Sequence, residues 1–470
     1  MGKLFTPHQR ILLWLACSAI FFEAFDVSIV NLALPVIATD LRIPLASTQW
    51  IQTLYLLSYG GFLLLGGRLC DFYGSKRIFL TGMLLFGVAS ATATLSYQLT
   101  PLLLARAGQG IGAALSMPGG ISLLTRHFKE GQQKQTAFGI FGAFAAAGFA
   151  GGLALGGMIA SFFNWHWIFG INVPVIGAVL AAGYFFIPNS LTNNGAPVSV
   201  LTACWLTASL LLFCYGVHES PRLGWRLIPC LLAATASGMA LLRYDRRQAQ
   251  PFFGSGIYLT PAAYKALGAS FILGANFLGF VFIGTLSLYE LLHWNIRSTG
   301  LLLFPYSIGS ALVSKFLLPR LFRQMSVRQV GLLSMSCLLA GSLLLAAGIY
   351  THGLVYFLVA LFLVNSVCIA IGYPALTILS LTGVAPAQQG MAAGLQSSIY
   401  SIGTGIGLSL IGLSLQAFSH YSSEIQLISA CGGVTILCGI ALLLLRQRAY
   451  RKHRRWDRGS SASGTPPHQA

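Results

Sequence analysis

Long apolar runs dominate this chain of 470 residues, and their length constrains its fold more than any other feature. A helix needs about 20 consecutive apolar residues to cross a bilayer, whereas barrel strands appear as ~10-residue segments of alternating polarity. The sequence therefore predicts an all-α integral membrane protein with 14 transmembrane helices, at 11–37, 47–66, 78–98, 101–124, 136–160, 165–187, 198–217, 225–243, 263–289, 298–319, 329–349, 354–382, 390–416 and 425–446.

The composition agrees with a membrane protein. Only 8% of the residues are charged and the mean hydropathy is +0.75, which excludes an ordinary soluble domain with about 25% charged residues. In a soluble chain the net charge of +18 would suggest nucleic acid. Here 22 of the 28 Lys and Arg residues lie on one side of the predicted membrane and four on the other. The positive-inside rule explains this asymmetry, so we expect cytoplasmic termini and no nucleic-acid partner.

The spacing of the runs suggests a duplication, with six spans, two further spans and six more. We expect an N-terminal six-helix bundle over 11–187, two inserted helices within 188–250 and a second six-helix bundle over 251–446. Transporters built from repeats hold their substrate near the midplane between the halves. The basic segment 447–470 is expected to be a disordered cytoplasmic tail that contacts anionic lipid headgroups.

Two acids, Glu23 and Asp26, lie inside the first apolar run. At 1.5 Å per residue, Asp26 is about 22 Å from Ile11, near the middle of a ~30 Å hydrocarbon core. A charge there costs about 2.5–3.5 kcal/mol, so such residues usually face a bundle interior. Glu23 projects from nearly the same face, and two neighbouring carboxylates seldom ionise together. We interpret the pair as a proton or cation site; the alternative is a carboxyl that only hydrogen-bonds a neighbouring helix.

A charged loop follows the second run, from Gly67 to Arg77. Asp71 can cap the helical turn that follows or pair with a basic neighbour, and Gly74 permits a tight bend. Its spacing resembles the cytoplasmic signature of the major facilitator superfamily, Gly-x-Leu-x-Asp-x-x-Gly-x-x-Arg. The resemblance implies that these four residues latch the cytoplasmic side of an alternating-access transporter.

The resemblance extends over nearly all of residues 11–446. The segment from Asp26 to Pro35 is similar to the first-helix signature of the fourteen-span drug:proton antiporters of the QacA/EmrB type. Gln49, Trp50 and Tyr55 are similar to the second-helix signature of that family. Further matches lie in Trp165–Phe169 with Asn172 and Pro174 and, more loosely, in Gly372–Ala375 and in Gly390 with Ala393–Gln396.

In the fourth run, Arg106–Ala114 is similar to the segment associated with proton coupling in this family. A buried guanidinium stays charged, so it needs an acidic or polar partner, and Asp26 or Glu23 is the obvious candidate. Protonating the acid would weaken the pair and free Arg106, which gives the proton a two-state element to bias. The alternative is an arginine that only hydrogen-bonds helix ends.

The fifth run departs from the family pattern. Antiporters of this superfamily usually carry Gly-Pro-x-x-Gly-Gly, whereas this chain has Leu153 in the position of the proline. The glycines are retained, and the missing proline should leave the helix straighter. This departure bears on the direction of transport rather than on the fold.

Several polar residues in or beside the runs are candidates for substrate contacts. They are Gln109, Asn276, Tyr289 and Gln396, with Glu290 and Asn365 as further positions. The alternative for each is an interhelical hydrogen bond, which is the usual role of a polar residue in a membrane helix.

These observations predict a proton-coupled secondary transporter that exports small amphipathic or cationic compounds, as in multidrug efflux. Asp26 would bind the proton, Glu23 would modulate it or attract cations, and Arg106 would sense the change. No phosphate-binding loop, metal-ligand set or catalytic grouping is evident, so we expect no cofactor, metal or enzymatic activity. We expect a monomer in a bacterial inner membrane whose partners are substrate, protons and lipids. The alternatives are a proton-coupled transporter of an organic anion or metabolite, and a lipid translocator or sensor with a transporter fold.

Overall fold

The computed structural model describes residues 5–128, 132–189, 200–218, 227–248, 259–384 and 389–446, and every regular element within these ranges is helical. The predicted tail at 447–470 lies outside them. Helices in the first part of the chain are α1 (Pro7–Asp40), α2 (Leu45–Tyr73), α3 (Ser75–Thr94), α4 (Leu99–His127), α5 (Gln132–Phe162), α6 (Trp167–Gly170) and α7 (Asn172–Phe186). Two helices follow, α8 (Val200–His218) and α10 (Leu227–Arg246).

The rest of the chain contains helices with two π-helical interruptions. In order these are α11 (Pro261–Glu290), α12 (Ile296–Leu312), η2 (Val313–Leu317), α13 (Leu318–Gln324), α14 (Val327–Thr351), α15 (Leu354–Leu361), η3 (Phe362–Cys368), α16 (Ile369–Ser380), α17 (Gln389–Ala417) and α18 (Ser423–Arg446). The tenth and twelfth apolar runs therefore each form three consecutive elements rather than one uniform helix. Pro319, just after η2, explains the first interruption, because its ring would clash with the carbonyl of Lys315 in a regular helix.

The first helix is longer than its apolar run because a polar cap begins it. The Thr6 hydroxyl accepts from the backbone N–H of Gln9, and the Gln9 side chain accepts from the backbone N–H of Thr6. This capping box, with Pro7 at the first helical position, sets the start of α1. At 1.5 Å per residue, Asp26 is about 28 Å from that start and about 21 Å from Asp40 at the other end.

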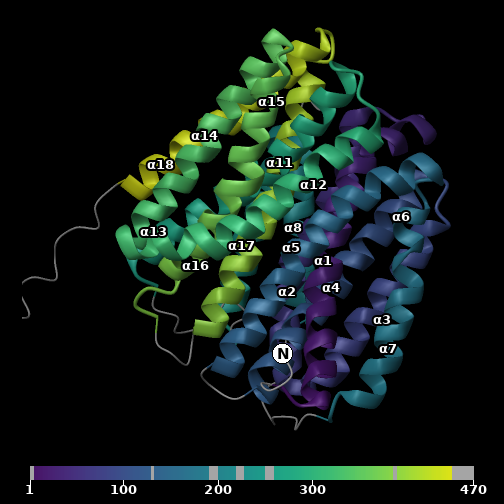
Figure 1. Cartoon of the computed structure of the whole chain (residues 1–470), viewed down its shortest axis with the longest axis vertical. Helices are drawn as coiled ribbons and strands as arrows, with labels where there is room; N and C mark the ends of the chain where they lie inside the picture. The colour runs from purple at the N-terminus through teal and green to yellow at the C-terminus, as the bar shows by residue number, and fades with distance from the viewer. Residues whose placement is uncertain are drawn as a thin grey trace, which may run out of the picture.

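The helices form two bundles (Figure 1). In the first, α1 packs against α4 and α5, and α2 and α3 pack against α4. In the second, α11 packs against α16, α17 and α18, and α14 packs against α16 and α18. The main contacts between the bundles are α2 with α17 and α5 with α12.

Glycine brings helix backbones into direct contact at several of these interfaces. A Cβ at Gly407 of α17 would collide with the backbone of Ala275 on α11. A Cβ at Gly152 of α5 would likewise meet Ser28 and the carbonyl of Phe25 on α1. Small residues permit this close approach in membrane bundles, where packing replaces the hydrophobic effect as a source of helix association.

Helix α8 lies against both bundles, because it contacts α2 and α17. The Cys214 thiol of α8 lies close to the Ser409 hydroxyl of α17. Helix α10 packs on α8, where Trp205 Nε1 donates to Ser237 Oγ at 2.8 Å. These helices fall within the segment predicted to hold two inserted spans.

Among the described residues, 12 helical segments are long and apolar enough to cross a membrane. Helix α4 is not among them. It has the necessary length, but Arg106 and Gln109 lower its mean hydropathy. The chain is therefore a multi-pass, all-helical membrane protein.

Candidate functional site

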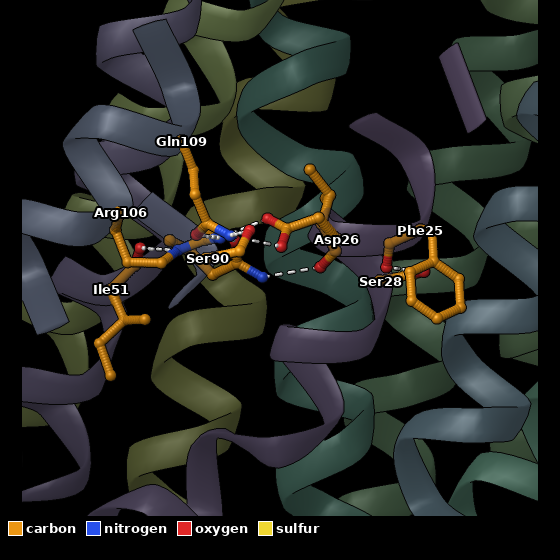
Figure 2. Close-up of polar contacts among 9 residues, drawn as sticks. Phe25, Asp26, Ser28, Ile51, Ser90, Arg106 and Gln109 are labelled. Atoms are coloured by element: carbon orange, nitrogen blue, oxygen red, sulfur yellow. Dashed lines mark hydrogen bonds and ion pairs between the residues drawn. The ribbon is translucent and has the colours of Figure 1, made fainter. Parts of the chain in front are cut away.

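A buried ion pair joins Asp26 of α1 to Arg106 of α4 (Figure 2). Both side chains are fully shielded from solvent. The other carboxylate oxygen of Asp26, Oδ1, accepts from Gln109 Nε2 at 3.2 Å. Gln109 Nε2 also donates to Ser90 Oγ at 2.9 Å, and Gln109 Oε1 accepts from Arg106 Nη1 at 2.8 Å. The carboxylate therefore has a partner at each oxygen, and α1, α3 and α4 together hold it.

The arginine has further partners on α2. Its Nε donates to the carbonyl of Ile51 at 3.0 Å, and its Nη2 donates to Gln52 Oε1 at 3.1 Å. Gln52 Nε2 in turn donates to the carbonyl of Val27 at 2.7 Å. The guanidinium carbon lies 4.3 Å from the ring centroid of Tyr55. Arg106 therefore keeps a set of neutral partners even when Asp26 carries no charge.

Sequence determines this arrangement in two ways. Taking an isolated charge out of water is costly, so a buried arginine and a buried aspartate are stabilised by pairing and by hydrogen bonds that satisfy their remaining polar atoms. The small residues of α4 then allow the approach that the pairing needs. A Cβ at Gly110 would collide with the carbonyl of Tyr55 on α2, and one at Gly112 would meet the backbone of Phe86 on α3.

Among the described residues no hydrogen bond links Glu23 to this network, but its charge interacts with that of Asp26, as expected for two acids on nearly the same face of α1. Its side chain is half-buried. It interacts electrostatically with the hydroxyls of Tyr59 on α2, Tyr373 on α16 and Tyr400 on α17, which we call the tyrosine cluster. The rings of Tyr373 and Tyr400 meet edge to face with centroids 5.1 Å apart. Glu23 therefore lies within electrostatic range of side chains from both bundles.

The residues of the predicted latch lie at the junction of α2 and α3. Gly74 has φ +88°, which an L side chain rarely adopts, and begins α3. Of the two roles expected for Asp71, a cap on the next helix is not observed, because Asp71 lies in the last turn of α2 and α3 has no side-chain cap. The side chain of Asp71 interacts instead with Arg126 of α4. Asp71 and Arg77 are exposed, and a Cβ at Gly67 would meet nothing within 4 Å.

The four residues proposed for substrate contact do not form one site. Gln109 belongs to the ion-pair network. Asn276 and Tyr289 lie about 20 Å apart along α11 at 1.5 Å per residue. Asn276 is buried and donates to Cys438 Sγ at 3.6 Å, and Gln396 is buried and donates to Ser270 Oγ at 3.4 Å. The side-chain oxygens of Asn276 and Gln396 have no partner among the described residues.

Two parts of the site were not predicted from the sequence, namely Gln52 and the tyrosine cluster. A signal for both was present on α2, where Gln49, Gln52, Tyr55 and Tyr59 recur at spacings of three and four residues. This spacing places polar side chains along one face of a helix. In an apolar run, such a polar face indicates a bundle interior rather than lipid.

Comparison with known proteins identifies relatives of this chain. The family model "Major Facilitator Superfamily" matches residues 16–407 and 266–465. A cephamycin export protein of Amycolatopsis lactamdurans is 30% identical over 458 residues, which cover 94% of this chain and 91% of the relative. A puromycin resistance protein of Streptomyces alboniger is 30% identical over 85% of this chain and 80% of its own length.

The fold also matches solved structures. A POT family transporter in complex with a thioalcohol-conjugated peptide superposes with a TM-score of 0.68 at 13% identity, covering 93% of this chain and 96% of that one. At this level of identity the likeness shows the fold alone. Among the described residues, no group of three or more His, Cys, Asp and Glu side chains is placed to hold a metal ion.

Proposed function

Because this chain belongs to the major facilitator superfamily, we propose that it exports small drug-like molecules in exchange for protons by alternating access. Two relatives that match most of its length are named for cephamycin export and puromycin resistance. A shared export function is the simplest explanation for similarity that extends over both bundles. The family match assigns a transporter rather than an enzyme.

One observation carries the proton-coupled part of this proposal, namely the buried pair of Asp26 and Arg106. A proton arriving at Asp26 removes its charge and with it the electrostatic attraction to α4. Arg106 then remains bound to Gln52 and to the Ile51 carbonyl, both on α2. Protonation therefore changes which helix holds the guanidinium, which is the kind of differential contact that shifts a two-state equilibrium.

The substrate would bind between the bundles, beside Glu23 and the tyrosine cluster. A carboxylate close to aromatic faces favours a cationic or amphipathic molecule, since aromatic rings attract cations electrostatically. Glu23 and the tyrosine cluster together come from α1, α2, α16 and α17, so movement of one bundle against the other would separate them. Gln109 belongs to the ion-pair network. The other three residues predicted to contact substrate, Asn276, Tyr289 and Gln396, would have secondary roles in substrate binding.

We further propose the fourteen-span arrangement of the drug:proton antiporters, with α8 and α10 as the two additional spans and both termini in the cytoplasm. Gly67, Asp71, Gly74 and Arg77 would form a latch that closes the cytoplasmic side in the outward-facing state. The exposure of Asp71 and Arg77 supports a latch that is open here. Gly300 of α12, which lies against Leu32 and the backbone of Leu153, supports a closed outer side.

Transport in proteoliposomes tests the proposal. Vesicles in which the cytoplasmic face is outward and the lumen is acidic should accumulate puromycin, and collapse of the gradient with nigericin should abolish accumulation. Asp26→Asn should accumulate no more than empty vesicles while still exchanging labelled for unlabelled substrate. Glu424→Gln is the matched control, because Glu424 is an exposed carboxylate whose ion-pair partner among the described residues is His352, and it should behave as wild type.

Two outcomes would contradict the proposal. Accumulation that ignores the gradient in wild type would exclude proton coupling. Gradient-driven movement in the opposite direction would exclude export and favour uptake of an organic anion or metabolite. The direction of transport is the property on which the replacement of the family proline by Leu153 bears.

A further inference from the structure

Asp26 lies deep in α1 and needs a route by which protons reach it. Both carboxylate oxygens are occupied and the side chain is fully shielded. At 1.5 Å per residue, about 21 Å of α1 separates Asp26 from Asp40, its outer end. A proton cannot cross such a distance through apolar packing, so polar groups must carry it.

Two amides lie in that direction, and neither has a hydrogen-bond partner. Asn31 of α1 and Gln49 of α2 are each 1% exposed. Among the described residues, none donates to or accepts from any of the four polar atoms of these two side chains. Both residues belong to segments that resemble family signatures, yet the ion-pair network uses neither. Buried polar groups of native proteins are satisfied by protein or by ordered water.

The register of α1 against α2 brings the two amides to the same level. Gln52 donates to the carbonyl of Val27, which fixes the antiparallel pairing of these helices. Asn31 lies one turn outward of Val27 on α1, and Gln49 lies one turn outward of Gln52 on α2. Since α2 begins at Leu45, Gln49 is about 6 Å from the outer end of its helix.

We propose that Asn31 and Gln49 bind a short file of water molecules that carries protons between the outer face and Asp26. An amide offers one acceptor and two donors, which match the two to four partners that a buried water requires. Successive polar groups on α2, Gln49 and Gln52, are about 4.5 Å apart along the axis, a step that one water bridges.

Water, not the amides, would carry the proton in this scheme. A proton from the outer solution enters the file as another leaves it to bind a carboxylate oxygen of Asp26, while the pair with Arg106 opens. Asp26 becomes neutral, the outer solution loses one proton, and the file has no net change. The inference rests on the proposed function, since it requires Asp26 to exchange protons during transport. It adds a site whose ligand is water and whose two amides act through that water as positioning residues.

Two rates measured in the same proteoliposomes test the inference. Net accumulation driven by the proton gradient needs the file, whereas exchange of labelled for unlabelled substrate needs no net proton movement and reports the amount of active protein. Asn31→Leu and Gln49→Leu should lower the ratio of net accumulation to exchange at least about tenfold, equivalent to about 1.4 kcal/mol of barrier. Asn31→Ser and Gln49→Ser, which leave room for water and retain a polar atom, should restore the ratio to near wild type.

Equal loss of both rates in the leucine variants, or an unchanged ratio, would overturn the inference while leaving the proposed function standing. Absence of gradient-driven accumulation in wild type would instead contradict the proposed function.

Footprinting with X-ray-generated hydroxyl radicals needs no variant, because radicals formed from bound water modify adjacent side chains. Leu32, next to Asn31 in the sequence, and Ile51, two residues from Gln49, are both fully buried. They should be modified at rates above those of Leu288 and Ile283, which are equally buried side chains of the same types. Rates equal to those of Leu288 and Ile283 would also overturn the inference.

Discussion

A double-mutant cycle on Asp26 and Arg106 measures how strongly the two buried charges depend on each other. Asp26→Asn keeps the shape and an acceptor for Gln109 but leaves the guanidinium without a counter-ion. Arg106→Met leaves the carboxylate uncompensated. Because each variant breaks a buried ion pair whose members are both fully shielded, each should lower the free energy of unfolding by about 3–5 kcal/mol.

The double variant carries neither charge, so it avoids the penalty that dominates each single variant. Its destabilisation should be smaller than the sum of the two single effects by about 3 kcal/mol or more. Reversible unfolding by denaturant in detergent micelles, followed by circular dichroism, supplies all four free energies. The exposed pair of His352 and Glu424 is the control, and its cycle should give a coupling of about 0–1 kcal/mol.

Additivity within about 0.5 kcal/mol at Asp26 and Arg106 would refute this reasoning. It would mean that each charge is stabilised by its own surroundings, such as water or backbone dipoles, and not by the other. The proton-dependent exchange of partners described for Arg106 would then have no energetic basis.

Three further predictions concern packing and pH. Gly407→Val should lower the free energy of unfolding by about 1–3 kcal/mol, because its side chain would collide with the α11 backbone. Gly432→Val, where a Cβ has open space, should leave the free energy of unfolding at the wild-type value. Equal effects of the two variants would contradict the glycine contact. Ser409→Cys should form a disulfide with Cys214 under mild oxidation, because these two side chains lie close together across α8 and α17. The disulfide should appear as a change in gel mobility when the protein is reduced, and a thiol pair that stays reduced would contradict this packing. Burial lowers the pKa of His166 in the loop between α5 and α6. The unfolded chain therefore binds a proton at His166 more readily than the folded chain, and the free energy of unfolding should fall as the pH drops through about 6.5. A wild-type protein whose unfolding depends on pH in the same way as His166→Gln would contradict this.

The sequence predicts Asp26 and Arg106 well, because charge is so costly in a bilayer that each of them has to find a partner. It could not predict that Asp26, and not Glu23, would be that partner. Residues three apart on a helix differ by about 60° around its axis, which is enough to direct one carboxyl toward α4 and the other toward α16 and α17. Only the packing of the surrounding helices decides between them.

Other features depend on long-range packing that no local pattern contains. The amide of Gln52 has ordinary sequence neighbours, and its role appears only when α2 is placed between α1 and α4. The π-helical segment η3 (Phe362–Cys368) arises inside an apolar run whose composition is typical of a regular helix. By contrast, the start of α1 at Pro7 follows from local chemistry, since the capping box of Thr6 and Gln9 is complete in the sequence.

Direct measurement of proton release on substrate binding tests the central claim, that Asp26 is the group that exchanges the transported proton. Purified protein is first brought to a pH acidic enough to protonate Asp26 and open its pair with Arg106. Mixed with puromycin in weakly buffered detergent solution at that pH, it should release protons that a pH-indicator dye reports, and Asp26→Asn should release none while still binding the compound. Equal proton release from wild type and Asp26→Asn would contradict the account, because the exchanged proton would then belong to another group.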